Sequence, residues 1–271
     1  MGMFSGKTAI VTGGASGIGK ALGQELASRG ANVILADVNA KLLEDVAGSM
    51  SKAGHKVHPT ALDVCDFAAV RKLVEDTTVR HGRLDYLFNN AGIGVGGAAH
   101  DFSFADWKTV IDTNLYGVVN GVAVAYPIMV KQGFGHIINT ASLAGLIPAP
   151  GEISYAASKY GVVGLSHVLR IEGERFGVRV SVVCPGFIET QIFYNAKLIN
   201  LDRKKMIDAL PRCMPVEECA REILHGVERN KPTIVVTRFA KVLWLAYRFW
   251  PSFIFWLGRR YAKRMSDLKT Q

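Results

Sequence analysis

The chain has 271 residues, of which 49% are apolar and 20% are charged, and its formal net charge is +9 at pH 7. This composition is typical of one large α/β domain with its own core, and it excludes a disordered, collagen-like or disulfide-stapled chain. The four cysteines include no Cys-x-x-Cys pair, so we expect reduced thiols and no metal site.

Apolar runs of strand length alternate with longer segments of helical period. The predicted strands are residues 8–12, 32–37, 56–62, 84–89, 136–140, 179–184 and 232–237, and the predicted helices are residues 17–29, 40–52, 67–81, 105–131 and 154–176. Runs that are apolar on both faces are typical of parallel strands covered by helices on both sides. The order predicts one doubly wound α/β domain over residues 1–237, with a parallel sheet of about seven strands. Residues 238–271 are predicted to form a helical, apolar and basic C-terminal extension.

A glycine-rich turn follows the first predicted strand and opens the first predicted helix. It reads Thr-Gly-Gly-Ala-Ser-Gly-Ile-Gly over residues 12–19. Glycines permit a tight turn and let a pyrophosphate approach the N–H groups at a helix N-terminus. The predicted dinucleotide contacts in this turn are Gly13, Ser16, Gly17, Ile18 and Gly19. Left-handed turns and helix caps need glycine for other reasons, so the interpretation depends on the residues that follow.

Asp37 ends the second predicted strand, where a carboxylate can accept hydrogen bonds from both ribose hydroxyls of adenosine. That carboxylate would repel a 2′-phosphate, and Ala15, Ser16 and Asn39 offer no cation to hold one. The sequence therefore favours NAD over NADP. The alternative for Asp37 is a helix N-cap, a role that Asn39 could fill instead.

The later strands also end in polar or glycine residues. Asp63 and Val64 are predicted to lie near the adenine, although Asp63 could support the turn while Asp66 caps the next helix. The turn at residues 89–92 could pass under the cofactor, or it could be an ordinary strand-to-loop turn. Its predicted cofactor contacts are Asn90, Ala91 and Gly92. Because parallel strands deliver their carboxyl ends to one edge of the sheet, six such strand ends predict a binding site at that edge.

Tyr155 and Lys159 are four residues apart in a predicted helix, so their side chains share one face. A nearby ammonium should lower the pKa of a phenol from its usual value near 10 and make Tyr155 a usable general acid or base. Ser142 follows a predicted strand, where its hydroxyl can hydrogen-bond a substrate oxygen. Amphipathic helices and strand-end turns also place such residues by themselves. Their occurrence together behind a dinucleotide turn predicts an active site.

Four motifs resemble, in order and spacing, those of the short-chain dehydrogenase/reductase family. They are Thr-Gly-x-x-x-Gly-x-Gly at residues 12–19, Asn-Asn-Ala-Gly at 89–92, Tyr-x-x-x-Lys at 155–159 and Pro-Gly at 185–186. The similarity covers residues 4 to about 237 and implies a Rossmann-type fold and a homodimer or homotetramer.

By that resemblance, Asn114 completes the catalytic set by holding a water in a proton relay to Lys159, although Asn114 alone could be a buried residue at a helix kink. The resemblance also implies that Lys159 contacts the nicotinamide ribose. The further cofactor contacts that it implies are Pro185, Gly186, Ile188 and Thr190.

These features predict an oxidoreductase that transfers a hydride between NAD(H) and an alcohol, ketone or aldehyde, with Tyr155 as general acid/base and Ser142 beside it on the substrate. The apolar segments 143–153 and 187–214, with Phe187 and Phe193, favour an apolar and lipidic substrate, although they could simply pack on the core. The alternative is a catalytically idle NAD-binding module that recruits partners or senses redox state at a membrane surface.

The net charge is concentrated in the C-terminal part. Nine of the 32 Lys and Arg residues lie within residues 229–266, which contain no Asp or Glu, so 23 basic residues face 23 acidic ones in the rest of the chain. Residues 239–257 hold three of the four tryptophans. This mixture predicts one or two short helices, broken near Pro251, that contact a membrane surface through residues 239–264.

The alternatives for this segment are an oligomer contact, a lid over the substrate pocket, or a spanning anchor. Its density of apolar residues argues against a nucleic-acid partner. We therefore expect a cytoplasmic protein that lies peripherally on a membrane.

Overall fold

The computed structural model describes residues 2–264. A seven-stranded sheet runs through it, and each neighbouring pair of its strands is parallel. The strands are β1 (Thr8–Thr12), β2 (Asn32–Asp37), β3 (Val57–Ala61), β4 (Tyr86–Asn89), β6 (Gly135–Thr140), β7 (Val178–Pro185) and β9 (Thr233–Val236). Their order is β3-β2-β1-β4-β6-β7-β9. Strands β2 and β3 lie on one side of β1, and β4 and the later strands lie on its other side. The strand order therefore reverses between β1 and β4, so a crevice is expected at their carboxyl ends.

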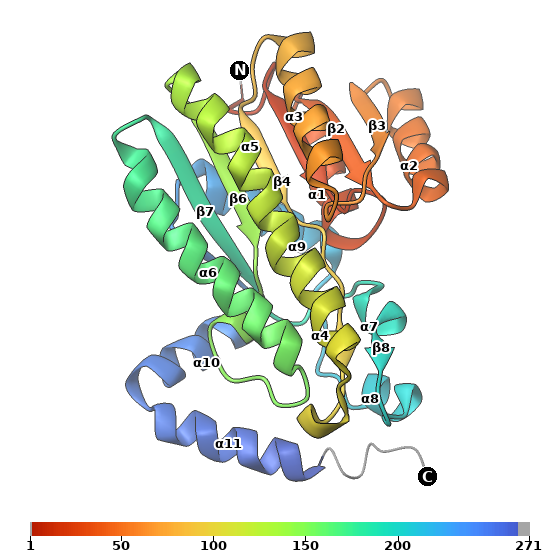
Figure 1. The fold of residues 1–271 in the computed structure, drawn as a ribbon, viewed down its shortest axis with the longest axis vertical. Helices are drawn as coiled ribbons and strands as arrows, with labels where there is room; N and C mark the ends of the chain where they lie inside the picture. Colours follow the sequence, from red (N-terminus) through yellow and green to blue (C-terminus); the bar gives the residue numbers. More distant parts are fainter. Residues whose placement is uncertain (1, 265–271) are drawn as a thin grey trace.

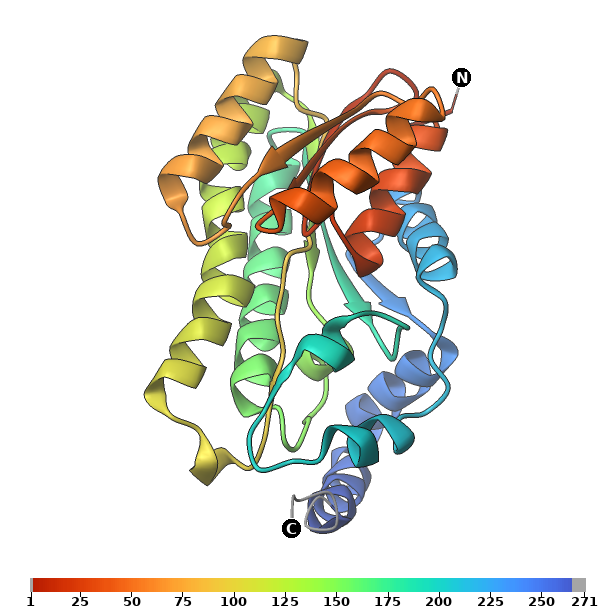
Figure 2. The same cartoon turned by 90° about the vertical axis from the view of Figure 1, so that its right-hand side faces the viewer.

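Helices cover both faces of the sheet (Figures 1 and 2). One face carries α1 (Gly17–Ser28), α2 (Ala40–Lys52) and α9 (Val216–Glu228), and the other carries α3 (Phe67–His81), α4 (Phe104–Ile111), α5 (Gly117–Gln132) and α6 (Ile153–Glu174). Strand β1 shows how the two cores arise, because successive strand residues point to opposite faces. Ala9 and Val11 pack in the cluster under α1, α2 and α9, whereas Ile10 packs in the cluster under α3 and α5.

The predicted fold class is confirmed, and the predicted strands differ from the observed ones by at most two residues at either end. Two differences are larger: the 13-residue helix α9 was not predicted, and the predicted helix 105–131 is not continuous. Residues Asp112–Tyr116 form a π-helical segment that separates α4 from α5. Small elements that the sequence did not predict also occur, among them β5 (Val95–Gly96), β8 (Lys197–Leu198), α7 (Ile192–Asn195) and α8 (Arg203–Asp208). The β5–β8 pair ties the segment after β4 to the segment after β7.

The C-terminal segment forms two helices, α10 (Arg238–Phe249) and α11 (Pro251–Arg264). The break near Pro251 is confirmed, and its cause is that proline lacks the N–H group that a continuing helix needs but is well suited to the first helical position. Ala240 and Ile254 are buried in a third apolar cluster with Leu146 and Ile147, which follow β6. The pair therefore packs at the end of the sheet where the strands deliver their carboxyl ends (Figure 1).

Within the described residues, one helical stretch is long and apolar enough to span a bilayer by length and composition alone, namely Phe104–Gln132. Its α5 part buries Val124, Ala125 and Met129 in the domain core. Helices α10 and α11 have 12 and 14 residues, which is short of the roughly 20 residues that span a bilayer.

Candidate active site

The glycine-rich turn joins β1 to α1 at the carboxyl edge of the sheet. Gly13 and Gly17 adopt left-handed backbone conformations, with φ of 69° and 50°. A Cβ atom on Gly19 would lie 2.1 Å from the carbonyl oxygen of Gly13. The turn is therefore too compact for a larger residue at Gly19, and glycine at this position keeps the backbone close.

Helix α1 begins without a side-chain cap. Ser16 occupies the N-cap position but makes no capping hydrogen bond, and the first turn contains no acidic residue. By contrast, α2 is capped by Asn39 and α3 by Asp66. The first N–H groups of a helix have no acceptor within the helix. The start of α1 thus offers the donors that a pyrophosphate requires, and the predicted contacts at Gly17, Ile18 and Gly19 lie there.

Asp37 lies at the end of β2 and faces this turn. Its carboxylate accepts hydrogen bonds from the N–H groups of Ala15, at 3.0 Å, and of Asn39, at 2.9 Å. Asn39 caps α2 by accepting a bond from the N–H of Leu42, so the alternative role of Asp37 as a helix cap is excluded. A carboxylate has about four lone-pair sites, so Asp37 can fix the turn and still accept bonds from ribose hydroxyls.

Asp63 supports a local turn, which is the second of the two roles that the sequence left open for it. Its carboxylate accepts the N–H of Cys65 at 2.9 Å, and Asp66 caps α3 through the N–H groups of Ala68 and Ala69. Val64 is buried beside Gly117, where an added Cβ would lie 2.7 Å from the Val64 side chain. These contacts give Asp63 and Val64 a structural role, and their predicted contact with an adenine stays a prediction.

The turn after β4 connects the glycine-rich turn to the predicted catalytic residues. The hydroxyl of Thr12, at the end of β1, accepts the N–H groups of Asn90 and Ala91 at 2.9 and 3.1 Å. A Cβ on Gly92 would lie 3.2 Å from Asn114 Oδ1 and 3.5 Å from Lys159 Nζ. This turn is therefore built into the candidate site, with its first residues beside β1 and Gly92 beside Asn114 and Lys159.

Lys159 and Tyr155 lie on α6 and Ser142 follows β6. Lys159 Nζ donates to the carbonyl oxygen of Thr140 at 2.9 Å, and it lies 5.4 Å from the centre of the Tyr155 ring. The Ser142 hydroxyl accepts the N–H of Ala144 at 3.1 Å. Its interaction with the phenol favours the ionised form of Tyr155. The structure thus brings the three residues together at the carboxyl edge of the sheet.

Asn114 is fully buried within the π-helical segment. Its side-chain amide donates to the carbonyl oxygen of Ile93 at 2.9 Å and accepts the N–H of Ile93 at 2.8 Å. These two bonds fix the chain just after the turn that Gly92 ends. Single π-turns occur frequently at functional sites because they re-aim one side chain.

Burial shifts the pKa values of Lys159 and Tyr155. It lowers the pKa of Lys159 to about 8. Burial also raises the pKa of Tyr155 above its usual value, and the charge of Glu152 raises it further. The net shift in the tyrosine's pKa is therefore upward, opposite to the expected one, because burial desolvates the phenol and disfavours the phenolate.

Glu152 is a site residue that the sequence reasoning missed. It occupies the N-cap position of α6, three residues before Tyr155, and makes no capping hydrogen bond. The residue is exposed overall, yet the protein around its carboxyl raises the pKa to about 7 by desolvation. The available signal was its spacing, since residues three apart on a helix are neighbours.

The segment after β7 forms another side of the candidate active site. Ile188 is buried and Thr190 lies against Gly17, where an added Cβ would lie 3.3 Å from the threonine methyl group. The rings of Phe187 and Phe193 stack with centres 6.4 Å apart, and Phe187 also contacts Phe239 of α10 at 5.9 Å. Pro185 ends β7, and Gly186 lies so close to Thr237 that an added Cβ would be 2.5 Å from its hydroxyl. The predicted cofactor contacts and the aromatic residues thus share one segment.

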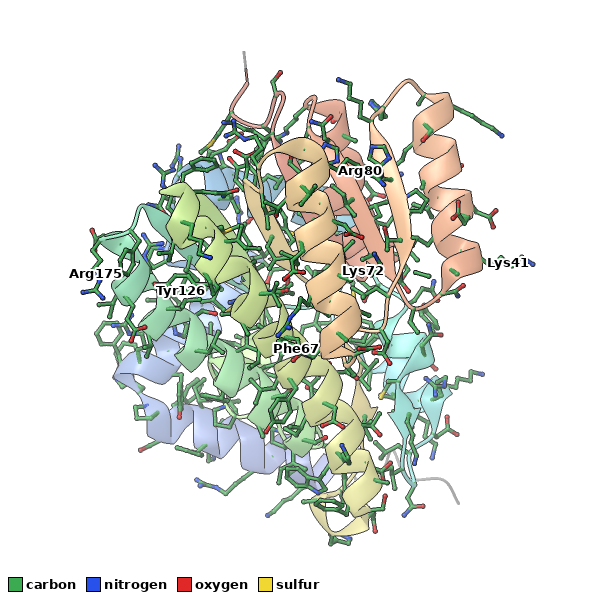
Figure 3. All side chains as sticks on the ribbon, turned by 45° about the horizontal axis from the view of Figure 1, so that its top comes forward. Lys41, Phe67, Lys72, Arg80, Tyr126 and Arg175 are labelled. Atoms are coloured by element: carbon green, nitrogen blue, oxygen red, sulfur yellow. The ribbon has the colours of Figure 1, made fainter. Side chains whose placement is uncertain are left out.

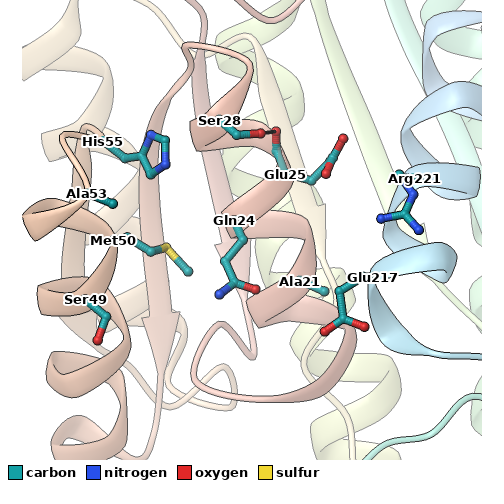
Figure 4. Close-up of a pocket in the computed structure, with 10 residues that line it drawn as sticks. All are labelled: Ala21, Gln24, Glu25, Ser28, Ser49, Met50, Ala53, His55, Glu217 and Arg221. Carbon is teal, nitrogen blue, oxygen red and sulfur yellow. Dashed lines mark hydrogen bonds between the residues drawn. The ribbon is translucent and has the colours of Figure 1, made fainter.

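Two surface hollows lie elsewhere. A groove of about 350 Å³ is bounded by α1, α2 and α9 (Figure 4). Another, of about 520 Å³, lies beside α4 at Phe104 and Trp107. Neither contains any residue of the candidate active site, which is recognised by its converging side chains.

Comparison with known proteins yields consistent relatives. A family model described as short chain dehydrogenase matches residues 7–198. The 3-oxoacyl-[acyl-carrier-protein] reductase FabG of Thermotoga maritima is 38% identical over 223 residues, which cover 82% of this chain and 90% of that protein. Levodione reductase of Leifsonia aquatica is 38% identical over 196 residues, which cover 71% and 73%. A short chain dehydrogenase/reductase from Burkholderia phymatum, solved in complex with NAD, has a TM-score of 0.84 at 30% identity and covers 92% of this chain and 95% of its own.

Proposed function

The chain belongs to the short-chain dehydrogenase/reductase family, and from that premise we propose that it transfers a hydride between NAD(H) and an apolar alcohol, ketone or aldehyde. The observation that carries the proposal is the position of Gly92. Its turn is hydrogen-bonded to Thr12 at the start of the glycine-rich turn, and an atom added to Gly92 would lie 3.5 Å from Lys159 Nζ. One short turn thus joins the pyrophosphate cradle to the catalytic residues.

The choice of NAD rests on Asp37. Its carboxylate lies against the glycine-rich turn, where it can accept bonds from two ribose hydroxyls and would repel a 2′-phosphate. The residues proposed to hold NAD are the start of α1, Asp37, the turn at residues 90–92, Lys159 and the segment 185–190. When bound, the nicotinamide supplies the hydride chemistry.

Tyr155 is the proposed proton donor and acceptor. Because its pKa is raised, the phenol is protonated at neutral pH and can donate to a carbonyl oxygen during reduction. In the oxidation of an alcohol, Tyr155 must first lose that proton, so oxidation is favoured at alkaline pH. Ser142 can donate a hydrogen bond to the same oxygen as charge develops there. Lys159, whose pKa is about 8, can return a proton to the site near neutral pH, and Asn114 is proposed to hold the connecting water.

An apolar substrate is proposed from the residues around the site. Phe187 and Phe193 form a stacked pair in the segment after β7, and Leu146 and Ile147, which follow Ser142, lie in an apolar cluster. Aromatic and aliphatic walls with a few polar groups are typical of pockets for apolar ligands. A relative that is named as a reductase of 3-oxoacyl groups supports a carbonyl or alcohol on an aliphatic chain.

We also propose a homodimer or homotetramer in the cytoplasm. One face of α6 exposes Val168 and Ile171, at 57% and 76%, together with Gly164, which has open space around it. Apolar and small residues at helical spacing suit close packing against a second helix. The four described cysteines are all free thiols, which agrees with a reducing compartment. Sedimentation equilibrium of Val168→Glu beside the unmodified protein tests this assembly, and an unchanged mass would exclude this face.

The proposed activity is tested by following NADH formation from NAD with alcohols of increasing chain length, and NADH consumption with the matching ketones. Turnover that rises with chain length is the expected result. Tyr155→Phe should retain NAD binding and lose turnover. If the unmodified protein binds NAD but turns over no substrate of the series, the idle-module alternative replaces the enzyme. If Tyr155→Phe keeps its turnover, the assignment of the proton-transfer residue is wrong.

A further inference from the structure

Helices α10 and α11 expose large apolar side chains where a surface helix usually carries polar ones. On α10 the exposed apolar residues include Val242, Leu245 and Phe249, which are spaced by three and four residues and so share one face. The exposed apolar residues of the two helices and the junction between them are Phe239, Val242, Leu245, Phe249, Trp250, Phe253, Phe255, Trp256 and Tyr261, each at least 42% exposed. We call this set, with the cations around it, the aromatic–basic surface.

The charge of the two helices is of one sign, although Lys241 pairs with Glu222 of α9 at 3.3 Å. Its exposed cations are Arg238, Lys241, Arg248, Arg259, Arg260, Lys263 and Arg264, and no Asp or Glu occurs between residues 229 and 266. Two of these cations lie over aromatic rings of the same helices. The guanidinium of Arg260 is 4.5 Å from the Trp256 ring centre, and that of Arg248 is 5.4 Å from the Trp244 ring centre. Aromatic and cationic groups are therefore mixed across the surface.

The opposite sides of the two helices are fixed to the domain beside the active site. Ile254 is buried among the residues that follow Ser142, and a Cβ on Gly258 would lie 3.6 Å from Pro150. Two members of the surface also reach the site, since Phe239 contacts Phe187 and the charge of Glu152 acts on Tyr261. The aromatic–basic surface is therefore held in a defined orientation by the same segments that line the catalytic residues.

We propose that the aromatic–basic surface docks the protein on the face of an anionic lipid bilayer. Tryptophan and other aromatic side chains favour the boundary between headgroups and acyl chains, and arginine and lysine are attracted to anionic headgroups. Because the helices are anchored in the domain and too short to span the bilayer, they lie along its surface. This docking is independent of the proposed hydride transfer.

A second copy of the chain is the competing occupant, and the charge argues against it. A symmetric interface brings the same patch of both copies together, so seven cations would meet seven cations. The cores of protein interfaces are usually depleted of charge. An anionic surface neutralises these cations, whereas an identical surface repels them.

Co-sedimentation of the full chain with vesicles tests the proposal. We expect binding to phosphatidylcholine vesicles that contain phosphatidylserine, weak binding to phosphatidylcholine alone, and release by added salt. Arg248→Gln with Arg259→Gln should weaken binding about 25-fold, since one cation near an anionic surface contributes about 1 kcal/mol, or about fivefold. Trp250→Ser with Phe253→Ser should weaken it at least about tenfold.

Matched variants lie on helices α3 and α4, outside the aromatic–basic surface. Arg71 stacks over the Phe67 ring at 4.8 Å much as Arg248 lies over Trp244, and Arg80 lies further along α3 (Figure 3). Arg71→Gln with Arg80→Gln removes the same charge and should leave vesicle binding within about twofold. Val79 and Phe104 are 85% and 83% exposed, so Val79→Ser with Phe104→Ser is the control for the aromatic pair. Thermal unfolding of each variant shows that the domain is intact.

Two results would overturn the proposal. One is equal binding of the unmodified protein to both kinds of vesicle, or binding to neither. The other is a change of oligomer mass for Trp250→Ser with Phe253→Ser in sedimentation equilibrium, with vesicle binding unaffected, which would assign the surface to contact between copies.

Discussion

Glu152 stands three residues before Tyr155 at the start of α6, and its negative charge raises the pKa of the Tyr155 phenol. A carboxylate beside the proposed acid/base group opposes the formation of a phenolate, because two negative charges would then face each other. The same carboxylate is itself partly protonated near neutrality, since desolvation raises its pKa to about 7. The carboxylate therefore helps to keep Tyr155 in its protonated form near neutral pH.

Glu152→Gln should shift the pH dependence of alcohol oxidation toward lower pH. Oxidation requires the phenolate, the charge of Glu152 raises the pKa of Tyr155, and removal of that charge lowers this pKa. The alkaline rise in kcat/KM for oxidation should then occur at lower pH, while reduction at neutral pH changes little. Glu152→Asp keeps the charge and serves as the control. Identical profiles for Gln and the unmodified protein would show that the tyrosine does not sense Glu152.

Asp37→Asn should reduce the preference for NAD over NADP by about tenfold or more. A charge of this kind contributes about 1 to 4 kcal/mol to the repulsion of a nearby phosphate, and 1.4 kcal/mol is a factor of ten. The N–H groups of Ala15 and Asn39 bond to different oxygens of the Asp37 carboxylate, and asparagine has one amide oxygen, so a loss of about 1–3 kcal/mol of stability is expected. The measurement is the ratio of kcat/KM for the two cofactors in folded protein, and an unaltered ratio would remove Asp37 from the ribose site.

Asn114→Ala should destabilise the protein by about 1–3 kcal/mol, because it leaves the backbone N–H and carbonyl of Ile93 without their partner in a buried position. Urea unfolding measures this loss. Activity should fall by more than the fraction of unfolded protein explains, since the proposed water site is also lost. Asn120→Ala removes one half-buried bond to Val64 farther along the same helix and should lower stability without the loss of turnover.

Gly19→Ala and Gly48→Ala should act in opposite directions although both residues lie in helices. A Cβ added at Gly19 would meet the carbonyl oxygen of Gly13, whereas Gly48 on α2 has open space around it. We expect Gly48→Ala to stabilise the protein by about 0.5–1 kcal/mol. Gly19→Ala should lower thermal stability and abolish NAD binding, measured by protein fluorescence quenching. Normal NAD affinity in Gly19→Ala would show that the turn can accommodate a Cβ atom for which the structure leaves no room.

Local sequence pattern was sufficient for the sheet because each strand carries its own signal. Thr8–Thr12 is apolar throughout its middle, and it is followed at once by glycines that end it. The helix ends at Asn39 and Asp66 were also readable, since capping residues act on the next few N–H groups. The two alternatives left open for Asp37 and Asp63 needed distances to decide which residue caps which helix.

What the sequence could not supply is the result of burial and of long-range contact. The π-helical segment around Asn114 contains no proline or glycine that would signal a change of helix type, and its bonds to Ile93, 21 positions away, cannot be read from the sequence. The sequence placed Lys159 beside Tyr155 correctly, but the direction of the net shift in the tyrosine's pKa depends on how far the phenol is removed from water. The sequence also could not show which residues the aromatic side chains of α10 and α11 contact, since Phe187 and Phe239 are 52 positions apart.

The π-helical segment also sets the rotation of α4 relative to α5 about the helix axis. A π-turn adds one residue to an otherwise regular helix, and each residue advances a helix by about 100°. Deletion of one residue between Ile111 and Gly117 would therefore rotate α4 by about 100° relative to α5, while the core side of α5 stayed in place. The exposed ring of Phe104 would then face a different direction from the domain. The direction in which α4 presents its outer side is thus coupled, through a single inserted residue, to the placement of Asn114.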